Sequence, residues 1–92
     1  MGYEWDGAKC ENNLKDHGVD FAAVEDFDWD ASLTLQDGRN EYGEDRFISV
    51  APIQDRLHVL VWTPRGGNVR VISLRKANSR EVRNYERQTQ ER

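Results

Sequence analysis

Positively charged residues are concentrated in one apolar stretch of this 92-residue chain, from position 56 to position 76. No acidic residue occurs between Arg56 and Arg80. The planar guanidinium group of arginine pairs with two phosphate oxygens at once and keeps its charge at any ordinary pH, so this stretch suits a polyanion. The cations of the stretch are Arg56, Arg65, Arg70, Arg75 and Lys76.

Cleavage of an RNA backbone is one reaction that such cations can assist. The 2′-hydroxyl has to lose a proton, the phosphoryl oxygens need their charge neutralised, and the 5′-oxygen has to gain a proton. The candidates for charge neutralisation are Arg46, Arg65, Arg70 and Arg75. Because Arg70 and Arg75 are five residues apart, a regular strand would point them to opposite faces of a sheet. We therefore favour Arg75 unless a bulge intervenes.

Candidates for proton transfer are few. His17 is preferred because imidazole titrates near neutrality, although a histidine in the last turn of a helix also complements the helix dipole. His58 lies among apolar strand residues and is predicted to be a hydrogen-bonded core residue. Glu81 is a candidate base that a helix-capping role would also explain. Tyr85 either stacks on a nucleobase or packs against the protein.

The basic stretch is predicted to form a β-hairpin. Leu57–Trp62 and Val69–Leu74 are apolar runs rich in β-branched residues, and the segment between them contains Gly66 and Gly67. Glycine takes positive φ at no steric cost, which a tight hairpin turn requires. Further strands are expected at Tyr3–Trp5, Ala31–Gln36 and Arg46–Pro52, with a polar loop at Asp37–Glu44.

The first helix is expected between Asp6, a good N-cap residue, and Gly18, a good C-terminal residue. Cys10, Leu14 and His17 have i, i+4 and i+7 spacing, which predicts one inward stripe. A thiol on that stripe is more consistent with burial than with nucleophilic catalysis.

Two further helices are predicted. Asp20 is placed to cap a short helix at Phe21–Phe27, and Asn78 with Glu81 resembles a capping box at the start of the last helix. From Gln88 onward the chain is polar and is expected to fray. The order β-α-α-β-β-β-β-α predicts one α+β domain over residues 1–92, with an antiparallel sheet and the helices packed on one face.

The net charge of −4 hides a strong asymmetry between two parts of the chain. Residues 1–55 hold 4 Lys or Arg against 14 Asp or Glu, whereas residues 56–92 hold 9 against 3. This distribution favours a basic face for an anionic partner, while charge scattered over solvated surfaces remains the alternative.

Several classes of protein are disfavoured. A single cysteine, Cys10, rules out an intrachain disulfide, and the N-terminus has no apolar signal sequence. The longest apolar run is too short to cross a membrane, so a cytoplasmic location is expected. Two distant histidines and one cysteine give no metal-ligand spacing, and no cofactor motif is present, so neither a metal nor a cofactor is expected.

The ordered set of residues resembles the BrnT family of toxins. The N-terminal part of the pattern is Glu4-Trp5-Asp6, Lys9, Asn13, His17-Gly18-Val19 and Phe21. The later part is Arg46-Phe47-Ile48, Thr63, Arg65-Gly66, Arg70-Val71-Ile72-Ser73, Arg75, Ala77, Glu81 and Tyr85.

The resemblance implies a RelE-like fold and a metal-independent ribonuclease toxin that blocks translation and growth. It also implies neutralisation by a BrnA-like ribbon-helix-helix antitoxin, through which the pair would reach operator DNA. Combined with the reasoning above, it assigns catalysis to His17, Arg46, Arg75 and Glu81. It assigns RNA binding to Lys9, Lys15, Arg65, Arg70, Lys76 and Tyr85.

One departure from the family pattern concerns the residues before Gly18. Family members often carry Lys-His, whereas here Asp16 precedes His17 and the lysine is Lys15. A one-residue shift rotates a side chain by about 100° around a helix, which weakens the case for Lys15 as a phosphate ligand.

Two other functions are compatible with the sequence. The chain could be a non-catalytic binding module that acts with a DNA-binding antitoxin as an operon co-repressor. A general RNA-binding domain is the weaker alternative, because the chain lacks the paired exposed aromatics that bind single strands.

Overall fold

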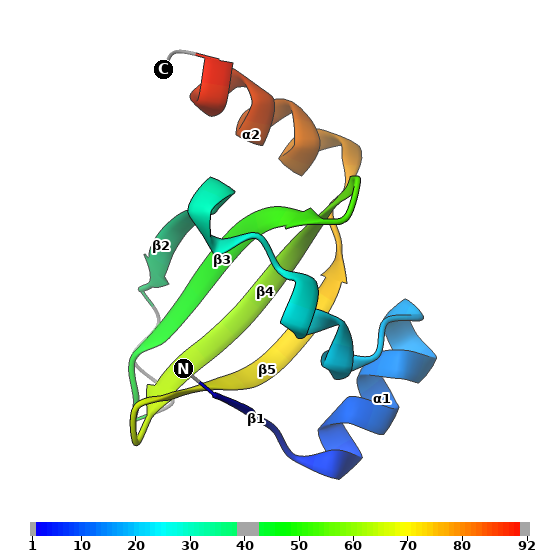
Figure 1. Ribbon diagram of the computed structural model, residues 1–92, viewed down its shortest axis with the longest axis vertical. Helices are drawn as coiled ribbons and strands as arrows, with labels where there is room; N and C mark the ends of the chain where they lie inside the picture. Colours follow the sequence, from blue (N-terminus) through cyan, green and yellow to red (C-terminus); the bar gives the residue numbers. More distant parts are fainter. Residues whose placement is uncertain (1, 39–42, 91–92) are drawn as a thin grey trace.

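A computed structural model of the chain describes residues 2–38 and 43–90, which form a five-stranded sheet with helices around it (Figure 1). The sheet order is β1-β5-β4-β3-β2. The elements are β1 (Tyr3–Glu4), α1 (Gly7–His17), the 3-10 helices η1 (Phe21–Asp26) and η2 (Trp29–Ala31), β2 (Leu33–Asp37), β3 (Arg46–Ile53), β4 (Arg56–Arg65), β5 (Asn68–Lys76) and α2 (Ser79–Gln90).

The sheet is mixed, so the prediction of a purely antiparallel sheet was wrong. Strands β2 to β5 form the expected antiparallel meander, but β1 runs parallel to β5, with Tyr3 opposite Val69 and Glu4 opposite Arg70. The five strands themselves were predicted. Parallel pairing of the first and last strands was not visible in the sequence because it joins segments more than sixty residues apart.

The predicted hairpin is present and its turn is tighter than expected. Arg65 pairs with Asn68, which leaves only Gly66 and Gly67 between the strands. Their φ angles are 58° and 83°, and two positive φ angles are what a two-residue turn matched to the sheet twist requires.

A β-bulge interrupts β5. Val61 of β4 lies opposite Ser73, but the next residue, Trp62, lies opposite Val71, so Ile72 has no partner on β4. The extra residue shifts the alternation of side chains along β5 by one position.

The bulge explains which residues of β5 are buried. Val69, Val71 and Leu74 are all buried, a spacing that no regular strand could place on one face. As a consequence, Arg70 and Arg75 lie on the same face, which is the exception that the sequence argument allowed.

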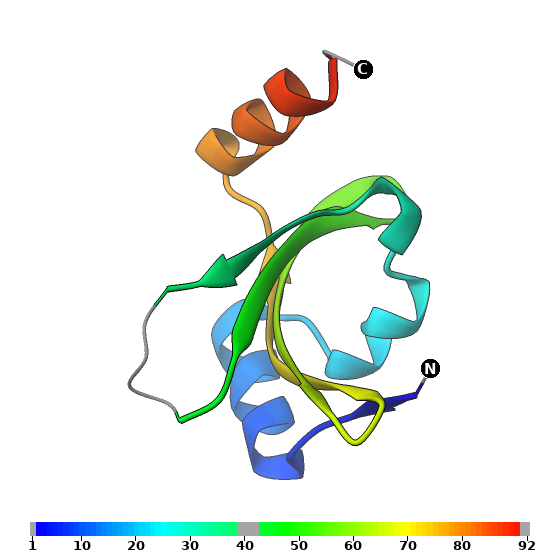
Figure 2. The same cartoon turned by 90° about the vertical axis from the view of Figure 1, so that its left-hand side faces the viewer.

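One face of the sheet carries the core, and the 3-10 helices cover it (Figure 2). Phe21 and Val24 of η1 are fully buried and pack with Phe27 against Leu60 and Leu74. The short helix expected at Phe21–Phe27 is therefore present as a 3-10 helix, and Asp20 caps it by accepting a hydrogen bond from the Ala22 N–H.

Helix α1 has the predicted ends, but of the residues on its predicted inward stripe only Cys10 packs against the core. Asp6 accepts hydrogen bonds from the backbone of the first turn, and Gly18 ends the helix with φ of 71°. Leu14, expected to point inward, is 48% exposed, and the buried residue is Asn13.

The reason is that α1 lies against the free edge of β5 rather than on an apolar face. The Asn13 amide donates to Leu74 O (2.6 Å) and to Val19 O (2.9 Å), and its Oδ1 accepts from the Leu74 N–H (3.3 Å). An asparagine side chain therefore completes the backbone hydrogen bonds of a strand edge, which an apolar stripe could not do.

Helix α2 lies at the end of the sheet, and none of its residues is buried. Asn78 and Glu81 form the predicted capping box, with bonds of 2.9 Å in both directions. The Tyr85 hydroxyl donates to Ala31 O at 2.6 Å. Because α1 lies at the edge of β5 and α2 lies near β2 and β3 on the face opposite the 3-10 helices, the prediction that all helices pack on one face was wrong.

Two other expectations concern the ends of elements. The helix continues through Gln90, so the fraying expected from Gln88 begins no earlier than that. Half of the loop expected at Asp37–Glu44, residues 39–42, lies outside the described residues, and Asp37 belongs to β2. No helix in the described part of the chain is long and apolar enough to cross a lipid bilayer.

Candidate functional site

The face of the sheet opposite the core, here called the outer face, carries the candidate residues. Cross-strand pairs define it row by row: Arg75 lies beside Val59, which lies beside Val50, and Ser73 lies beside Val61, which lies beside Ile48. Arg75 is the one charged residue in a row that is otherwise aliphatic, and packing of the row does not require a charged side chain there.

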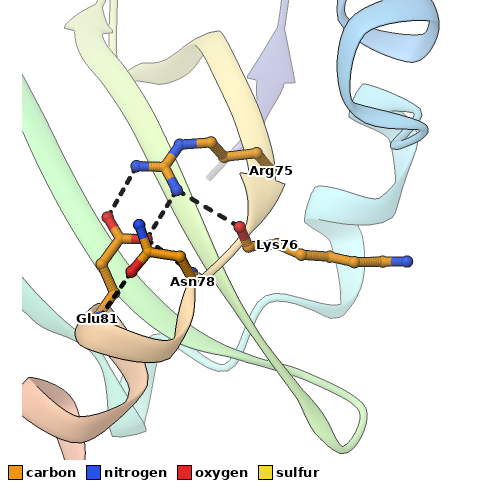
Figure 3. A network of polar contacts seen from close by, with 4 residues as sticks. All are labelled: Arg75, Lys76, Asn78 and Glu81. Carbon is orange, nitrogen blue, oxygen red and sulfur yellow. Dashed lines mark hydrogen bonds and ion pairs between the residues drawn. The ribbon is translucent and has the colours of Figure 1, made fainter.

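Arg75 is held by Glu81 in a two-pronged ion pair (Figure 3). The Nη1–Oε1 and Nη2–Oε2 distances are both 2.8 Å, and the side chains are 34% and 27% exposed. The ion pair links the C-terminal end of β5 to the first turn of α2. Glu81 also accepts a hydrogen bond from the Asn78 N–H of the capping box.

The ion pair keeps both groups charged. The hydrogen bond to Arg75 holds the pKa of Glu81 below its ordinary value, against an opposing effect of burial. The hydrogen bond to Glu81 likewise raises the pKa of Arg75. A carboxylate with a lowered pKa that already binds a guanidinium is poorly suited to accept a proton near neutrality. The geometry therefore favours the capping and positioning role of Glu81 over that of a general base.

Helix α1 brings two more candidates to the outer face. Lys9 and His17 line a shallow hollow of about 210 Å³ together with Ile72 and Ser73 of the bulge. Ser73 and Arg75 are two residues apart on the same face of β5, but Arg75 does not line the hollow, and its guanidinium points toward Glu81 of α2 (Figure 3). Asn12, Asn13 and Asp16 complete the lining.

Lys15 does not line this hollow, although it is exposed on the same helix. Its neighbour Asp16 does line it, as the one-residue shift in the sequence suggests. Lys9 is therefore the lysine that the fold places beside His17.

Arg46 and Arg70 lie at the other end of the outer face. Register places Arg70 opposite Thr63, whereas Arg46 begins β3 and is four residues from Val50 in the row of Arg75. At about 3.3 Å per residue, Arg46 is roughly 13 Å further along the strands than Arg75. Thus the structure does not bring Arg46 and Arg75 together.

Both of these arginines also have acidic neighbours. The Arg46 Nε lies 3.2 Å from Glu44 Oε2, and the Arg70 Nη1 lies 4.0 Å from Glu4 Oε1. Glu4 Oε1 is buried without a hydrogen-bond partner, so Arg70 is the nearest compensation for its charge.

The remaining candidates are separated from the hollow. Arg65 is exposed beside the hairpin turn. The Lys76 side chain points away from Arg75 (Figure 3), since consecutive strand residues face opposite ways. Tyr85 anchors α2 through its hydroxyl, which agrees with the packing role that the sequence left open.

His58 is a satisfied core residue, as predicted. It is buried, and its Nδ1 lies 2.8 Å from the Arg56 carbonyl oxygen. Burial, together with the nearby charges of Lys76 and Arg56, lowers the pKa of His58, while the hydrogen bond opposes this effect. Elsewhere, no three His, Cys, Asp or Glu side chains of the described residues are grouped as metal ligands.

Sequence reasoning missed Asn13 and Ser73 as parts of this region. The spacing of Val69, Val71 and Leu74 was an available signal for a bulge, but Ile72 between them hid the break in alternation. For Asn13 the sequence carried no signal beyond its place in the family pattern.

Comparison with known families gives a clear result for residues 5–81, which match the model of the ribonuclease toxin BrnT of type II toxin–antitoxin systems. The chain belongs to the BrnT family. This assignment confirms the resemblance identified from the sequence. A comparison with individually curated proteins gives no match.

As a BrnT-family member, the chain is a ribonuclease toxin by family, and a type II system implies a protein antitoxin as its partner. The matched range contains the hollow of Lys9 and His17, the bulge and both partners of the Arg75–Glu81 ion pair. It ends before Tyr85.

Proposed function

We propose that this chain is a metal-independent endoribonuclease toxin with a RelE-like fold, which cuts RNA in the cytoplasm and so inhibits translation and growth. The family assignment supports the ribonuclease activity, and the α+β architecture is compatible with that fold. The observation that carries the assignment of a site is the hollow in which Lys9 and His17 meet Ser73, two residues from Arg75.

The proposed reaction needs no group outside this region. The 2′-oxygen loses its proton to His17 and attacks the phosphorus atom, and the bond from phosphorus to the 5′-oxygen breaks. The 5′-oxygen takes a proton from the imidazolium, leaving a 2′,3′-cyclic phosphate. Arg75 and Lys9 stabilise the negative charge on the phosphoryl oxygens.

Glu81 acts through Arg75 as a positioning residue in this scheme. Its two carboxylate oxygens hold the guanidinium in place on the outer face, so little side-chain entropy is lost when phosphate binds. Arg46, Arg65 and Arg70 lie further along the sheet, toward the hairpin turn, where they can contact the RNA on one side of the cut.

The proposed protein partner is a BrnA-like ribbon-helix-helix antitoxin, with operator DNA bound only through that partner. The type II family supports a protein antitoxin. Residues 1–55 hold 14 acidic residues against 4 basic ones, and this excess of negative charge repels DNA. The charge therefore supports a protein, and not a nucleic acid, as the direct regulator of this chain.

Growth experiments test the proposal. We expect expression of the chain without its antitoxin to arrest bacterial growth, and Arg75→Ala to relieve the arrest. Arg83→Ala, which removes an exposed arginine of α2, is the matched control and should still arrest growth. Normal growth with soluble wild-type protein in the cell would contradict the toxin assignment.

A non-catalytic co-repressor is the second candidate, and one observation favours it. Both terminal nitrogens of Arg75 already bind Glu81, which reduces the capacity of the guanidinium to bind phosphate. This alternative predicts a tight complex with the antitoxin but no cleavage of any RNA by the purified chain.

A further inference from the structure

A second hollow lies between α2 and the outer face of the sheet. It has a volume of about 400 Å³, and its floor is aliphatic: Leu33 and Leu35 of β2 with Ile48 and Val50 of β3. Leu35 is 63% exposed, the most exposed large apolar side chain of the described residues. An apolar floor open to water suits the apolar side chains of another protein better than it suits phosphate.

The hollow is poorly filled because α2 is held mainly by polar ties. These are the ion pair of Glu81 with Arg75 and the hydrogen bond of Tyr85 with Ala31. None of the residues of α2 is buried, so the helix overhangs the aliphatic floor without covering it.

Two arginines of α2, Arg80 and Arg87, lie beside the hollow without lining it, and Glu81, the one charged residue of the described chain that lines it, is already paired with Arg75. Asn84 lines the hollow, and Arg80 and Arg87 share its stripe of the helix at i−4 and i+3. Both arginines are exposed, and neither forms an ion pair within the described part of the chain. A ligand that fits must therefore offer apolar side chains to the floor and carboxylates to the two arginines beside it.

We propose that this hollow is the docking site for an acidic, amphipathic segment of the antitoxin. The inference rests on the protein partner in the proposed function, not on the ribonuclease chemistry. Charge complementarity selects the occupant: Arg80 and Arg87 favour an acidic segment, and the floor of Leu33, Leu35, Ile48 and Val50 favours an apolar one.

The hollow lies close to Arg75, so a segment docked in it would affect the proposed RNA site. Val50 of the floor is in the same row as Val59 and Arg75, and Glu81 lines the hollow while it binds Arg75. A segment seated there extends over the Arg75 end of the outer face. Docking would thus block the approach of RNA without touching His17.

The test measures binding of the purified chain to the protein encoded beside its gene, by titration calorimetry. Leu35→Gln and Arg87→Glu should each weaken the complex about tenfold or more, as loss of a buried anchor or a charge pair usually does. Leu14→Gln and Arg83→Glu are the matched controls, since Leu14 is exposed on α1 and Arg83 lines a different hollow with Arg56 and Val82. Both controls should bind within about twofold of the wild type.

The outcomes separate this inference from the proposed function. Cleavage of RNA by the free Leu35→Gln variant at the wild-type rate, with weakened antitoxin binding, supports docking in the hollow. If the wild type cleaves no RNA but the same two variants still lose the antitoxin, the ribonuclease proposal fails and the docking site stands. If both variants bind the antitoxin as tightly as the wild type does, the inference is overturned. If the two variants in addition abolish a dimer of the chain, the hollow is a self-association surface instead.

Discussion

At the scale of single residues, the bond between Arg75 and Glu81 is the feature on which the account depends most. Glu81 makes three contacts at once: two with the guanidinium and one with the Asn78 N–H. Glu81→Gln keeps the shape but removes the charge, so it should lower the free energy of unfolding by about 1–2 kcal/mol, a figure reduced for partial exposure. Urea unfolding measures the loss, and Glu86→Gln on the same helix is the control.

The same ion pair has a pH dependence of known sign. Because the folded-state pKa of Glu81 lies below its ordinary value of 4.5, its contribution to stability is complete above that pH. The contribution is lost as the pH falls through the lowered pKa. The stability difference between wild type and Glu81→Gln should therefore shrink between pH 5 and pH 2, and a constant difference would argue against the ion pair.

His58 makes the stability of the fold depend on pH in a higher range, and here the cause is burial of the group and not an ion pair. Its folded-state pKa lies below 6.5 because burial disfavours the imidazolium, so the unfolded chain binds the proton more readily. Stability should be constant above about pH 6.5 and should fall as the pH is lowered through the folded-state value. Urea unfolding from pH 7.5 to 5 should show this decline in His17→Gln, the control, but not in His58→Leu.

At the scale of elements, Asn13 is the residue that fastens α1 to the sheet. Asn13→Ala leaves the Leu74 N–H and C=O and the Val19 C=O without their partner, which should cost about 2–4 kcal/mol of unfolding free energy. Asn12→Ala, its exposed neighbour, should cost less than about 0.5 kcal/mol. If Asn13→Leu is as stable as the wild type, the contact is ordinary packing and not completion of a strand edge.

What could be predicted from the sequence at this scale was local. The N-cap at Asp6, the end of α1 at Gly18, the capping box of Asn78 and Glu81, and the Gly66-Gly67 turn each depend on residues within a few positions of one another. Short-range hydrogen bonds and φ preferences determine these features whatever the rest of the chain does.

What could not be predicted depended on distant partners. The parallel pairing of β1 with β5, the bulge at Ile72 and the inward position of Asn13 all arise where remote segments meet. The prediction from helical periodicity assumed that α1 packs against an apolar surface, but α1 packs against the hydrogen-bonding edge of β5. For the candidate site, the fold brings Lys9 and His17 of the first helix to Ser73 of β5, whereas Arg46 lies at the other end of the outer face from Arg75.

At the scale of the whole molecule, the charge distribution predicts a focused rather than an extended RNA contact. With two to three phosphates neutralised near Arg75, RNA binding should weaken roughly tenfold between 50 and 200 mM salt, given a slope of about −0.7 per phosphate for single strands. The KM for a short RNA should carry this dependence while kcat stays nearly constant. A loss of a thousandfold or more would instead indicate a broad basic surface.

The central claim is that the outer face beside Arg75 cleaves RNA. Its most direct test is cleavage of a single-stranded RNA by the purified chain in the presence of EDTA, comparing the wild type with Arg75→Ala, His17→Gln and the control Arg83→Ala. The account predicts products with a cyclic phosphate from the wild type and from Arg83→Ala, and a loss of at least about a hundredfold in rate for the other two variants. Equal rates in all four proteins, or no cleavage by the wild type, would contradict it.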